Sequence, residues 1–118
     1  IFDLLGFLLG LFGLFLCWKA QNEMGKSWRV GIDTENKTTL ITSGAFEKIR
    51  NPTYSGFFLI CIGLFFIAPT TEVMVWITVL YISIEFQVRI EEEFLTDTHG
   101  EEYTQYCQTT RRYIPYLY

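Results

Sequence analysis

The apolar and polar positions divide the chain into two apolar stretches and the polar segments beside them. The longer stretch covers 57–83 and contains a single charge, Glu72, close to Pro69. One upright membrane helix needs about 20 apolar residues, so this stretch is long for one crossing. Because proline interrupts helical hydrogen bonding and a carboxylate is costly at the bilayer centre, we expect two helices, roughly 54–68 and 73–90, joined by a tight turn. The alternative is one kinked helix.

The positive charges give an independent test of this hairpin. Lysine and arginine occupy nine positions: Lys19, Lys26, Arg29, Lys37, Lys48, Arg50, Arg89, Arg111 and Arg112. A hairpin places all nine on one face of the membrane, whereas a single crossing would send the last three to the other face. The positive-inside rule therefore favours the hairpin, with the charged face in the cytoplasm.

The shorter apolar stretch covers 4–18 and predicts a transmembrane helix over 1–18 that ends at Lys19. Gly6 and Gly10 form a G-x-x-x-G pair, which can let another helix approach closely. The alternative is that these glycines are merely tolerated in a lipid-facing helix. Because the stretch starts almost at Ile1 and no initiator methionine is present, we expect residues upstream, with or without another span.

The polar segments complete the predicted organisation. We expect a cytosolic loop over 19–53, a transmembrane hairpin over 54–90, and a cytosolic helix and tail over 91–118. The pattern over 85–110 is helical, and Gly100 is expected to interrupt or end that helix. The fold class is therefore an all-α integral membrane protein, a multi-span helical bundle with a helix-turn-helix hairpin and a C-terminal juxtamembrane helix, in one domain.

Composition excludes several classes of function. The chain of 118 residues is 50% hydrophobic with a net charge of −4, and it has no basic patch interleaved with aromatic residues, so no nucleic-acid partner is expected. Cys17, Cys61 and Cys107 lack metal-ligand spacing, and His99 is the one histidine. We therefore expect free thiols and no metal site. Membrane lipids are the expected surroundings, and nothing in the sequence indicates an oligomeric state.

A charged stripe begins where the longer apolar stretch ends. Glu85, Arg89 and Glu92 or Glu93 share one helix face by their spacing. Charges buried near a membrane boundary cost several kcal/mol each unless they are paired and hydrogen-bonded, which makes the stripe a candidate site. The alternative is a surface ladder worth about 0.3–0.5 kcal/mol per pair. The hairpin would bring the segment around Arg50 to the same side of the membrane.

Two polar motifs carry a resemblance to a known family. The first, Arg-His-Pro-x-Tyr, is matched by Arg50, Pro52 and Tyr54, with Asn51 where many members carry histidine. The second, Arg-x-Glu-Glu followed by Leu, Gly-x-x-Tyr-x-x-Tyr and Ile-Pro, is matched by Arg89, Glu91, Glu92, Leu95, Gly100, Tyr103, Tyr106, Ile114 and Pro115. In this order, from about Gly25 to Pro115, the chain resembles the isoprenylcysteine carboxyl methyltransferases and, more broadly, the group that includes membrane phospholipid N-methyltransferases.

The resemblance implies a multi-pass membrane enzyme that uses S-adenosylmethionine and releases S-adenosylhomocysteine. The two motifs would form the cofactor pocket on the cytoplasmic side, and a lipophilic methyl acceptor would enter from the bilayer. The implied cofactor-binding residues are Gly44, Arg50, Asn51, Pro52, Tyr54, Glu91, Glu92, Tyr103 and Tyr106. The implied catalytic residues are Arg89, which would hold the acceptor's carboxylate, and Glu92. Asn51 can replace a neutral hydrogen bond of histidine but not a titrating one.

Three classes of function stay open. A carboxylate acceptor has a pKa near 4 and is already ionised at neutral pH, so its methylation needs no general base. This favours methylation of a lipophilic, isoprenylcysteine-like carboxylate. A phospholipid amine or other small-molecule acceptor would first have to lose a proton, for which His99 and the glutamates are the candidate bases. The third class is a non-catalytic membrane protein that packs helices.

Overall fold

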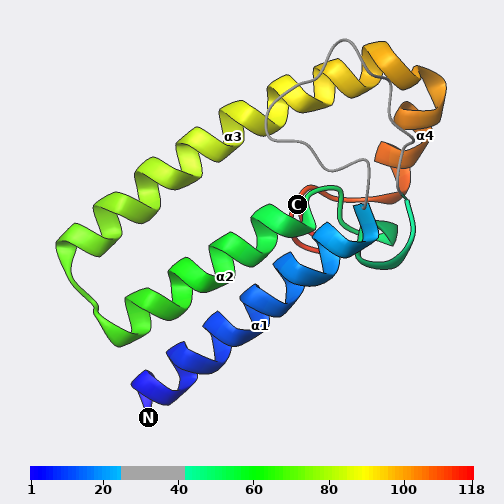
Figure 1. Ribbon diagram of the computed structural model, residues 1–118. Coiled ribbons are helices and arrows are strands. Elements are labelled where there is room, and N and C mark those ends of the chain that lie inside the picture. The colour runs from blue at the N-terminus through cyan, green and yellow to red at the C-terminus, as the bar shows by residue number, and fades with distance from the viewer. Residues whose placement is uncertain (25–41) are drawn as a thin grey trace.

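The computed structural model describes residues 1–24 and 42–118, which form helices and connecting turns (Figure 1). The elements in chain order are α1 (Phe2–Met24), the 3-10 helix η2 (Gly44–Glu47), α2 (Pro52–Ile67), α3 (Thr71–His99) and α4 (Glu101–Thr109). Within these residues there is no strand, only an isolated parallel bridge between Ile49 and Arg111. The predicted all-α fold class is confirmed.

The predicted hairpin is present as α2 and α3, with a short turn between them. Pro52 occupies the first turn of α2, where its missing N–H leaves no intrahelical hydrogen bond unmade. α2 ends at Ile67, just before Pro69, and α3 begins after Thr70. The Thr70 hydroxyl accepts a hydrogen bond from the Val73 amide at 3.2 Å and so caps α3. The turn thus lies where Pro69 and Glu72 predict it.

α1 and α2 run antiparallel in close contact through glycines. A Cβ atom on Gly6 would collide with the carbonyl oxygen of Gly63, and one on Gly13 would lie 2.5 Å from the carbonyl oxygen of Gly56. Gly10 has nothing within 4 Å of its Cβ position. Close helix approach therefore occurs as the sequence suggests, with Gly6 and Gly13 facing glycines of α2, and the Gly10 amide nitrogen lies 3.1 Å from the Cβ position of Gly63.

Two helix boundaries differ from expectation. α1 does not end at Lys19 but continues to Met24, and Lys19 pairs with Glu23 one turn later, with 3.9 Å between Nζ and Oε1. The expected cytosolic loop is therefore shorter than 19–53. α3 runs unbroken past the expected boundary near residue 90 to His99, where Gly100, with φ of 61°, ends it. The part of the motif resemblance that lies within 25–41 is outside the described residues, as are Lys26, Arg29 and Lys37.

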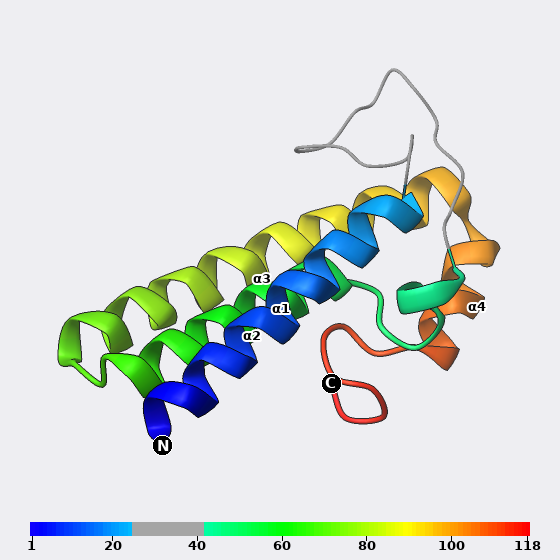
Figure 2. The same cartoon turned by 60° about the horizontal axis from the view of Figure 1, so that its bottom comes forward.

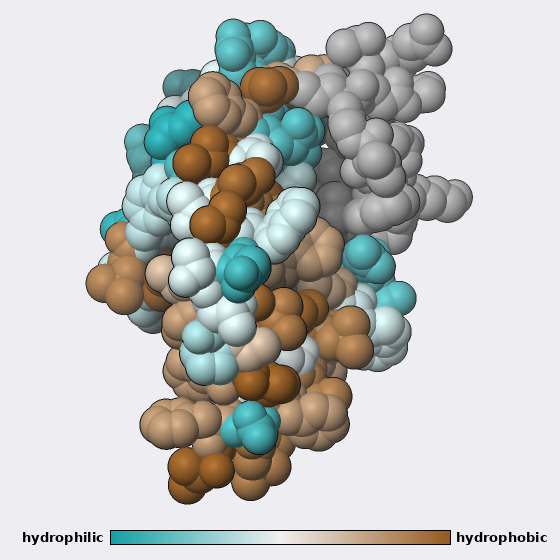
Figure 3. Space-filling view, turned by 90° about the vertical axis from the view of Figure 1, so that its left-hand side faces the viewer, coloured by the Kyte–Doolittle hydropathy of each residue, from teal (hydrophilic) through white to brown (hydrophobic). Residues whose placement is uncertain are grey.

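The long helices expose apolar side chains over most of their surface. Phe2–Glu23 and Thr71–His99 are long and apolar enough to cross a membrane, and only 17% and 11% of their most apolar windows are buried. Figure 3 views the molecule from the side of the hairpin turn, and apolar side chains gather over the lower part of this face. Such large apolar surfaces are unfavourable in water and favourable in lipid. Exposed apolar helices of this length are typical of a membrane protein.

At the opposite end of the bundle, α4, η2 and the segment after α4 lie beside the end of α1 and the start of α2 (Figures 1 and 2). Two buried clusters hold these parts together. One joins α1, η2 and α4 and consists of Ala20, Phe46, Tyr103 and Tyr106. The other joins α2, α3 and the segment after α4 and consists of Ile84, Val88 and Tyr113, with Tyr54, Phe58 and Leu80 packed against it. This end carries most of the residues that the two motifs contribute.

Candidate functional site

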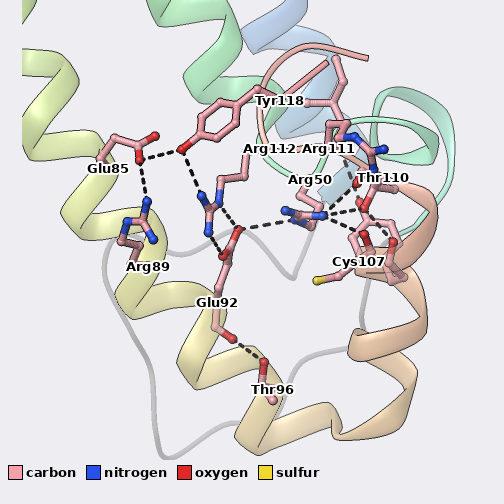
Figure 4. Close-up of polar contacts among 12 residues, drawn as sticks. Arg50, Glu85, Arg89, Glu92, Thr96, Cys107, Thr110, Arg111, Arg112 and Tyr118 are labelled. Atoms are coloured by element: carbon pink, nitrogen blue, oxygen red, sulfur yellow. Dashed lines mark hydrogen bonds and ion pairs between the residues drawn. The ribbon is translucent and has the colours of Figure 1, made fainter. Parts of the chain in front are cut away.

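The two motifs meet at the carboxylate of Glu92 (Figure 4). Arg112 donates from Nε to Oε2 and from Nη2 to Oε1, each at 3.0 Å, and Arg50 Nε lies 3.4 Å from Oε2. The three side chains are 13–19% exposed. A forked pair of charge-assisted hydrogen bonds of this kind is strong and geometrically specific. These hydrogen bonds to Glu92 raise the pKa of the Arg112 guanidinium, which stays charged.

Arg50 is fixed to the end of α4. Its Nη1 donates to the carbonyl oxygens of Cys107 at 3.1 Å and Thr110 at 3.0 Å, and to the Thr110 hydroxyl at 3.2 Å. The Arg50 amide donates to the carbonyl oxygen of Arg111 at 2.7 Å. Thr110 is only 1% exposed. The segment before α2 and the segment after α4 are therefore joined through one arginine, which binds carbonyl oxygens with one end and faces Glu92 with the other.

Glu91, the neighbour of Glu92, has a different environment. Its Oε1 accepts hydrogen bonds from the Tyr54 hydroxyl at 3.1 Å and from Gln87 Nε2 at 3.0 Å. Its Oε2 accepts no hydrogen bond from the described residues, and no arginine or lysine among them pairs with it. Of the two adjacent carboxylates, Glu92 is thus held between guanidinium groups, while Glu91 is held by neutral donors and keeps one oxygen for another partner.

Asn51 and Pro52 lie at the start of α2, beside this group. The Asn51 amide donates to the carbonyl oxygen of Arg112 at 3.0 Å, and Pro52 is fully buried. The side-chain nitrogen of Asn51 is buried without a hydrogen-bond partner among the described residues. One turn later, the Ser55 hydroxyl donates to the carbonyl oxygen of Tyr113 at 2.7 Å. An unpaired buried donor is uncommon, and this sets Asn51 apart from the paired polar groups around it.

Tyr103 and Tyr106 contribute packing at this end. They are 2% and 8% exposed, with ring centroids 6.0 Å apart. The Tyr106 hydroxyl donates to the carbonyl oxygen of Phe46 at 2.6 Å and so ties α4 to η2. Burial raises the pKa of both phenols, which keeps them neutral. In this structure the two predicted ligand-binding tyrosines form the core beneath the site.

Gly44 lies at the start of η2, against the end of α1. It has φ of 64°, and a Cβ atom there would collide with the Glu23 carboxylate. The following amide, that of Ala45, donates to Glu23 Oε2 at 2.6 Å. Both the left-handed conformation and the close approach of a side chain therefore require glycine here. The contact to Glu23 was not predicted.

Arg89 is the most exposed of the predicted site residues. Its guanidinium is 59% exposed and bonds Glu85 Oε2 one turn earlier at 3.3 Å. The same Glu85 oxygen accepts a hydrogen bond from the Tyr118 hydroxyl at 3.0 Å, and that hydroxyl accepts one from Arg112 Nη1 at 3.0 Å. The predicted stripe is therefore present, but Glu85–Arg89 and Glu92 are linked through the segment after α4 and not directly along α3.

The site contains residues that the sequence reasoning did not single out: Arg112, Thr110, Tyr113 and Tyr118. The sequence predicts only that they belong to a cytosolic helix and tail over 91–118. The signal that could have found Arg112 is its place directly before the Tyr-Ile-Pro that closes the second motif. Among residues 1–24 and 42–118 there is no group of metal-ligating side chains, and the three cysteines are free thiols.

Comparison with known proteins assigns the family. The Phospholipid methyltransferase family matches residues 2–102. The chain is 29% identical over 117 residues to the protein-S-isoprenylcysteine O-methyltransferase of Saccharomyces cerevisiae, covering 96% of the chain and 48% of the relative. It is 30% identical over 122 residues to the Homo sapiens protein of that name, covering 95% of the chain and 40% of the relative.

The chain spans about half the length of the curated relatives it matches, or less. The family match nevertheless covers most of the chain, both sequence motifs lie largely within it, and their residues meet in one place. The chain belongs to the phospholipid methyltransferase family.

Proposed function

We propose that the protein is an S-adenosylmethionine-dependent membrane methyltransferase that methylates the carboxylate of a lipophilic, isoprenylcysteine-like acceptor. The observation that carries this proposal is the meeting of Arg50 and Glu92, 3.4 Å apart, at the polar end of an apolar helical bundle. The names of the relatives support the same activity. Methyl transfer from a sulfonium needs positioning of two reactants, which can lower a barrier by about 7–11 kcal/mol, and exclusion of water.

The residues present fit the cofactor. S-adenosylmethionine combines a flat adenine, ribose hydroxyls, a cation and an amino-acid end, and so it needs acceptors, donors and flat surfaces. Asn51 offers an unpaired buried donor, and Glu91 Oε2 offers an acceptor beside the Tyr54 ring. Leaving a buried donor unpaired costs about 1–3 kcal/mol, which a bound ligand would recover. When bound, the cofactor supplies the methyl group.

Several further residues are proposed to shape this pocket without themselves binding the ligand through polar atoms. Glu92 would orient Arg50 and Arg112, because these two guanidinium groups occupy both of its oxygens. Gly44 and Pro52 would let the backbone approach the ligand closely. Tyr103 and Tyr106 would pack beneath the pocket and support it. A catalytic role is expected for Glu92, and we propose that this role is to position the charged groups around it.

Arg89 is proposed to bind the acceptor. Its guanidinium is exposed and makes only one hydrogen bond among the described residues, so it can hold a carboxylate through two parallel hydrogen bonds. Phe86 and Ile90, on either side of it in sequence, are 65% and 49% exposed and offer apolar contacts to a lipid chain. A carboxylate with a pKa near 4 is ionised at neutral pH, so this reaction requires no general base.

The same proposal includes the topology. α1 and the α2–α3 hairpin would cross the membrane, and the end that carries α4 would face the cytoplasm. The described basic residues lie on segments at that end, namely Lys19, Lys48, Arg50, Arg89, Arg111 and Arg112 (Figure 1). The positive-inside rule supports this orientation.

The second candidate is methylation of a phospholipid amine, which the description of the matching family favours. An amine acceptor is protonated at neutral pH, so this reaction needs a base. Glu91 lies within the proposed pocket, whereas His99 is the last residue of α3. The two candidates thus differ in whether a carboxylate at position 91 must accept a proton or only a hydrogen bond.

The test is methyl transfer from radiolabelled cofactor by detergent-solubilised protein, with farnesyl-cysteine or phosphatidylethanolamine vesicles as acceptor. A base-labile product from farnesyl-cysteine supports carboxyl methylation, and a base-stable product from the vesicles supports the second candidate. Arg89→Gln should abolish the first reaction, while Arg111→Gln, a matched loss of charge on an exposed residue, should retain it. A folded protein that neither binds S-adenosylhomocysteine nor transfers a methyl group would show that the chain is a non-catalytic relative.

A further inference from the structure

A single hydroxyl group connects the two ends of the proposed site. Tyr118 donates to Glu85 Oε2 at 3.0 Å and accepts from Arg112 Nη1 at 3.0 Å. Glu85 also binds Arg89, and Arg112 also binds Glu92. Figure 4 shows the resulting continuous chain of polar contacts alongside α3. The residues proposed to bind the acceptor are therefore in hydrogen-bonded contact with those proposed to shape the cofactor pocket.

The direction of these hydrogen bonds is fixed by the groups involved. A guanidinium can only donate, and an ionised carboxylate can only accept. The hydroxyl of Tyr118 has one proton, so it must donate that proton to Glu85 and accept from Arg112. Phenylalanine at position 118 would keep the aromatic ring and lose both hydrogen bonds. The Tyr118→Phe substitution therefore removes the hydroxyl group alone.

The backbone holds Tyr118 in place independently of this hydroxyl. The Tyr113 amide donates to the Tyr118 carbonyl oxygen at 2.8 Å, and the Tyr118 amide donates back to the Ile114 carbonyl oxygen at 3.2 Å. Tyr113 is only 6% exposed, and its ring meets the Phe58 ring edge-on with centroids 5.0 Å apart. This turn is thus anchored in the core by Tyr113, so we expect it to persist when the Tyr118 hydroxyl is absent.

The link through Tyr118 connects charged groups at the two ends of the site. Arg112 carries its charge between two carboxylates, and among the described residues Tyr118 links it to Glu85. Removing the hydroxyl would leave Arg112 Nη1 without this partner and would break the link between Glu85 and the Arg112–Glu92 pair. The orientation of Glu92, and through it that of Arg50, would then no longer depend on Glu85.

We infer that Tyr118 is a positioning residue that transmits the state of the Glu85–Arg89 pair to Arg112 and Glu92, so that the acceptor end and the cofactor end of the site are coupled. This inference rests on the proposed function, because it concerns the same cofactor pocket. It requires that Glu85, which lies two turns before Glu92 on α3, influences cofactor binding through Tyr118 alone.

The test uses S-adenosylhomocysteine as the only ligand, titrated calorimetrically into detergent-solubilised protein. Four variants are compared with wild type: Tyr118→Phe, Glu85→Gln, the double variant, and Tyr116→Phe. Tyr116 is the matched control, because it lies in the same turn, is 74% exposed and has its ring under the Lys48 ammonium, 4.8 Å from the ring centroid. Each titration is made well below the Tm of that variant, so that loss of fold does not contribute.

We expect Tyr118→Phe and Glu85→Gln each to raise the Kd about fivefold, and the double variant to raise it no further. Tyr116→Phe should leave the Kd unchanged. A double variant weakened by the product of the two single effects would overturn the inference, since Glu85 and Tyr118 would then act separately. So would a Tyr118→Phe protein that binds like wild type, and in that case the proposed function would stand. A folded wild-type protein without cofactor binding would instead reject the proposed function and this inference with it.

Discussion

Arg112 holds both carboxylate oxygens of Glu92 at 3.0 Å although the two residues lie 20 positions apart in the chain. The pair joins the segment after α4 to the last turns of α3. Because it also lies beside Arg50, the charge of Glu92 is shared between two guanidinium groups.

Replacing Arg112 by lysine should not preserve the site. Arg112 uses Nε, Nη1 and Nη2 for three hydrogen bonds in fixed directions, whereas an ammonium group at the end of a flexible chain cannot reproduce a planar fork. We expect Arg112→Lys to lower the free energy of unfolding by about 1–3 kcal/mol and to weaken S-adenosylhomocysteine binding. Chemical denaturation and calorimetric titration measure these effects. Arg111→Lys is the control, and an Arg112→Lys protein as stable as this control would contradict the prediction.

The adjacent carboxylates Glu91 and Glu92 should respond differently to the same isosteric change. Glu92→Gln removes the charge that lies between Arg50 and Arg112, so these cations would repel each other and Tm should fall. Glu91→Gln leaves the neutral partners Tyr54 and Gln87 in place, so Tm should change little while cofactor affinity falls. Thermal unfolding beside calorimetric titration separates the two outcomes. If Glu91→Gln binds S-adenosylhomocysteine as well as wild type does, Glu91 does not contact the cofactor.

The glycine contacts between α1 and α2 predict an asymmetry between two positions on one helix. Gly13→Ala places a methyl group against the carbonyl oxygen of Gly56, and this should destabilise the protein by about 1–3 kcal/mol through overpacking. Gly10→Ala places the same group where nothing lies within 4 Å, and it should be neutral or slightly stabilising because alanine favours helix. Thermal unfolding in one detergent compares the pair. Equal losses of stability would argue against this helix packing.

High pH should unfold the polar end of the protein. Burial raises the pKa of Tyr103, Tyr106 and Tyr113 above the usual value of about 10, so these phenols keep their protons in the folded state where an unfolded chain loses them. The unfolded state then binds fewer protons, and stability must fall as pH rises above about 10. Denaturation midpoints at increasing pH, with tyrosinate absorbance recorded in parallel, measure this. Tyr103→Phe should reduce the loss, and tyrosines that all ionise before unfolding begins would contradict the prediction.

The sequence predicts the helices well and the contacts between distant segments less well. The hairpin follows from local signals, since Pro69 and Glu72 interrupt an otherwise apolar stretch, whereas the Thr70 cap was not predicted. The extension of α1 beyond Lys19 was missed because a polar sequence can continue a helix when its end packs, as Ala20 does here. The proximity of Arg50 and Glu92 was accessible because each lies in a motif beside the hairpin. The position of Arg112 beside the second motif was a usable signal, but its partners were not accessible, because they come from α3 and from Tyr118 and no periodicity within 110–118 indicates them.

The unbroken course of α3 has a consequence for how the family can vary its substrates. Arg89 and Glu92 lie three positions apart on a continuous helix, a rise of about 4.5 Å along the axis. The helix therefore fixes the distance between the residue proposed to hold the acceptor and the residue proposed to position the charged groups. An inserted residue between them would turn one group by about 100° relative to the other. We expect substrate range to evolve through the apolar side chains around α3, while the length of this segment stays constant.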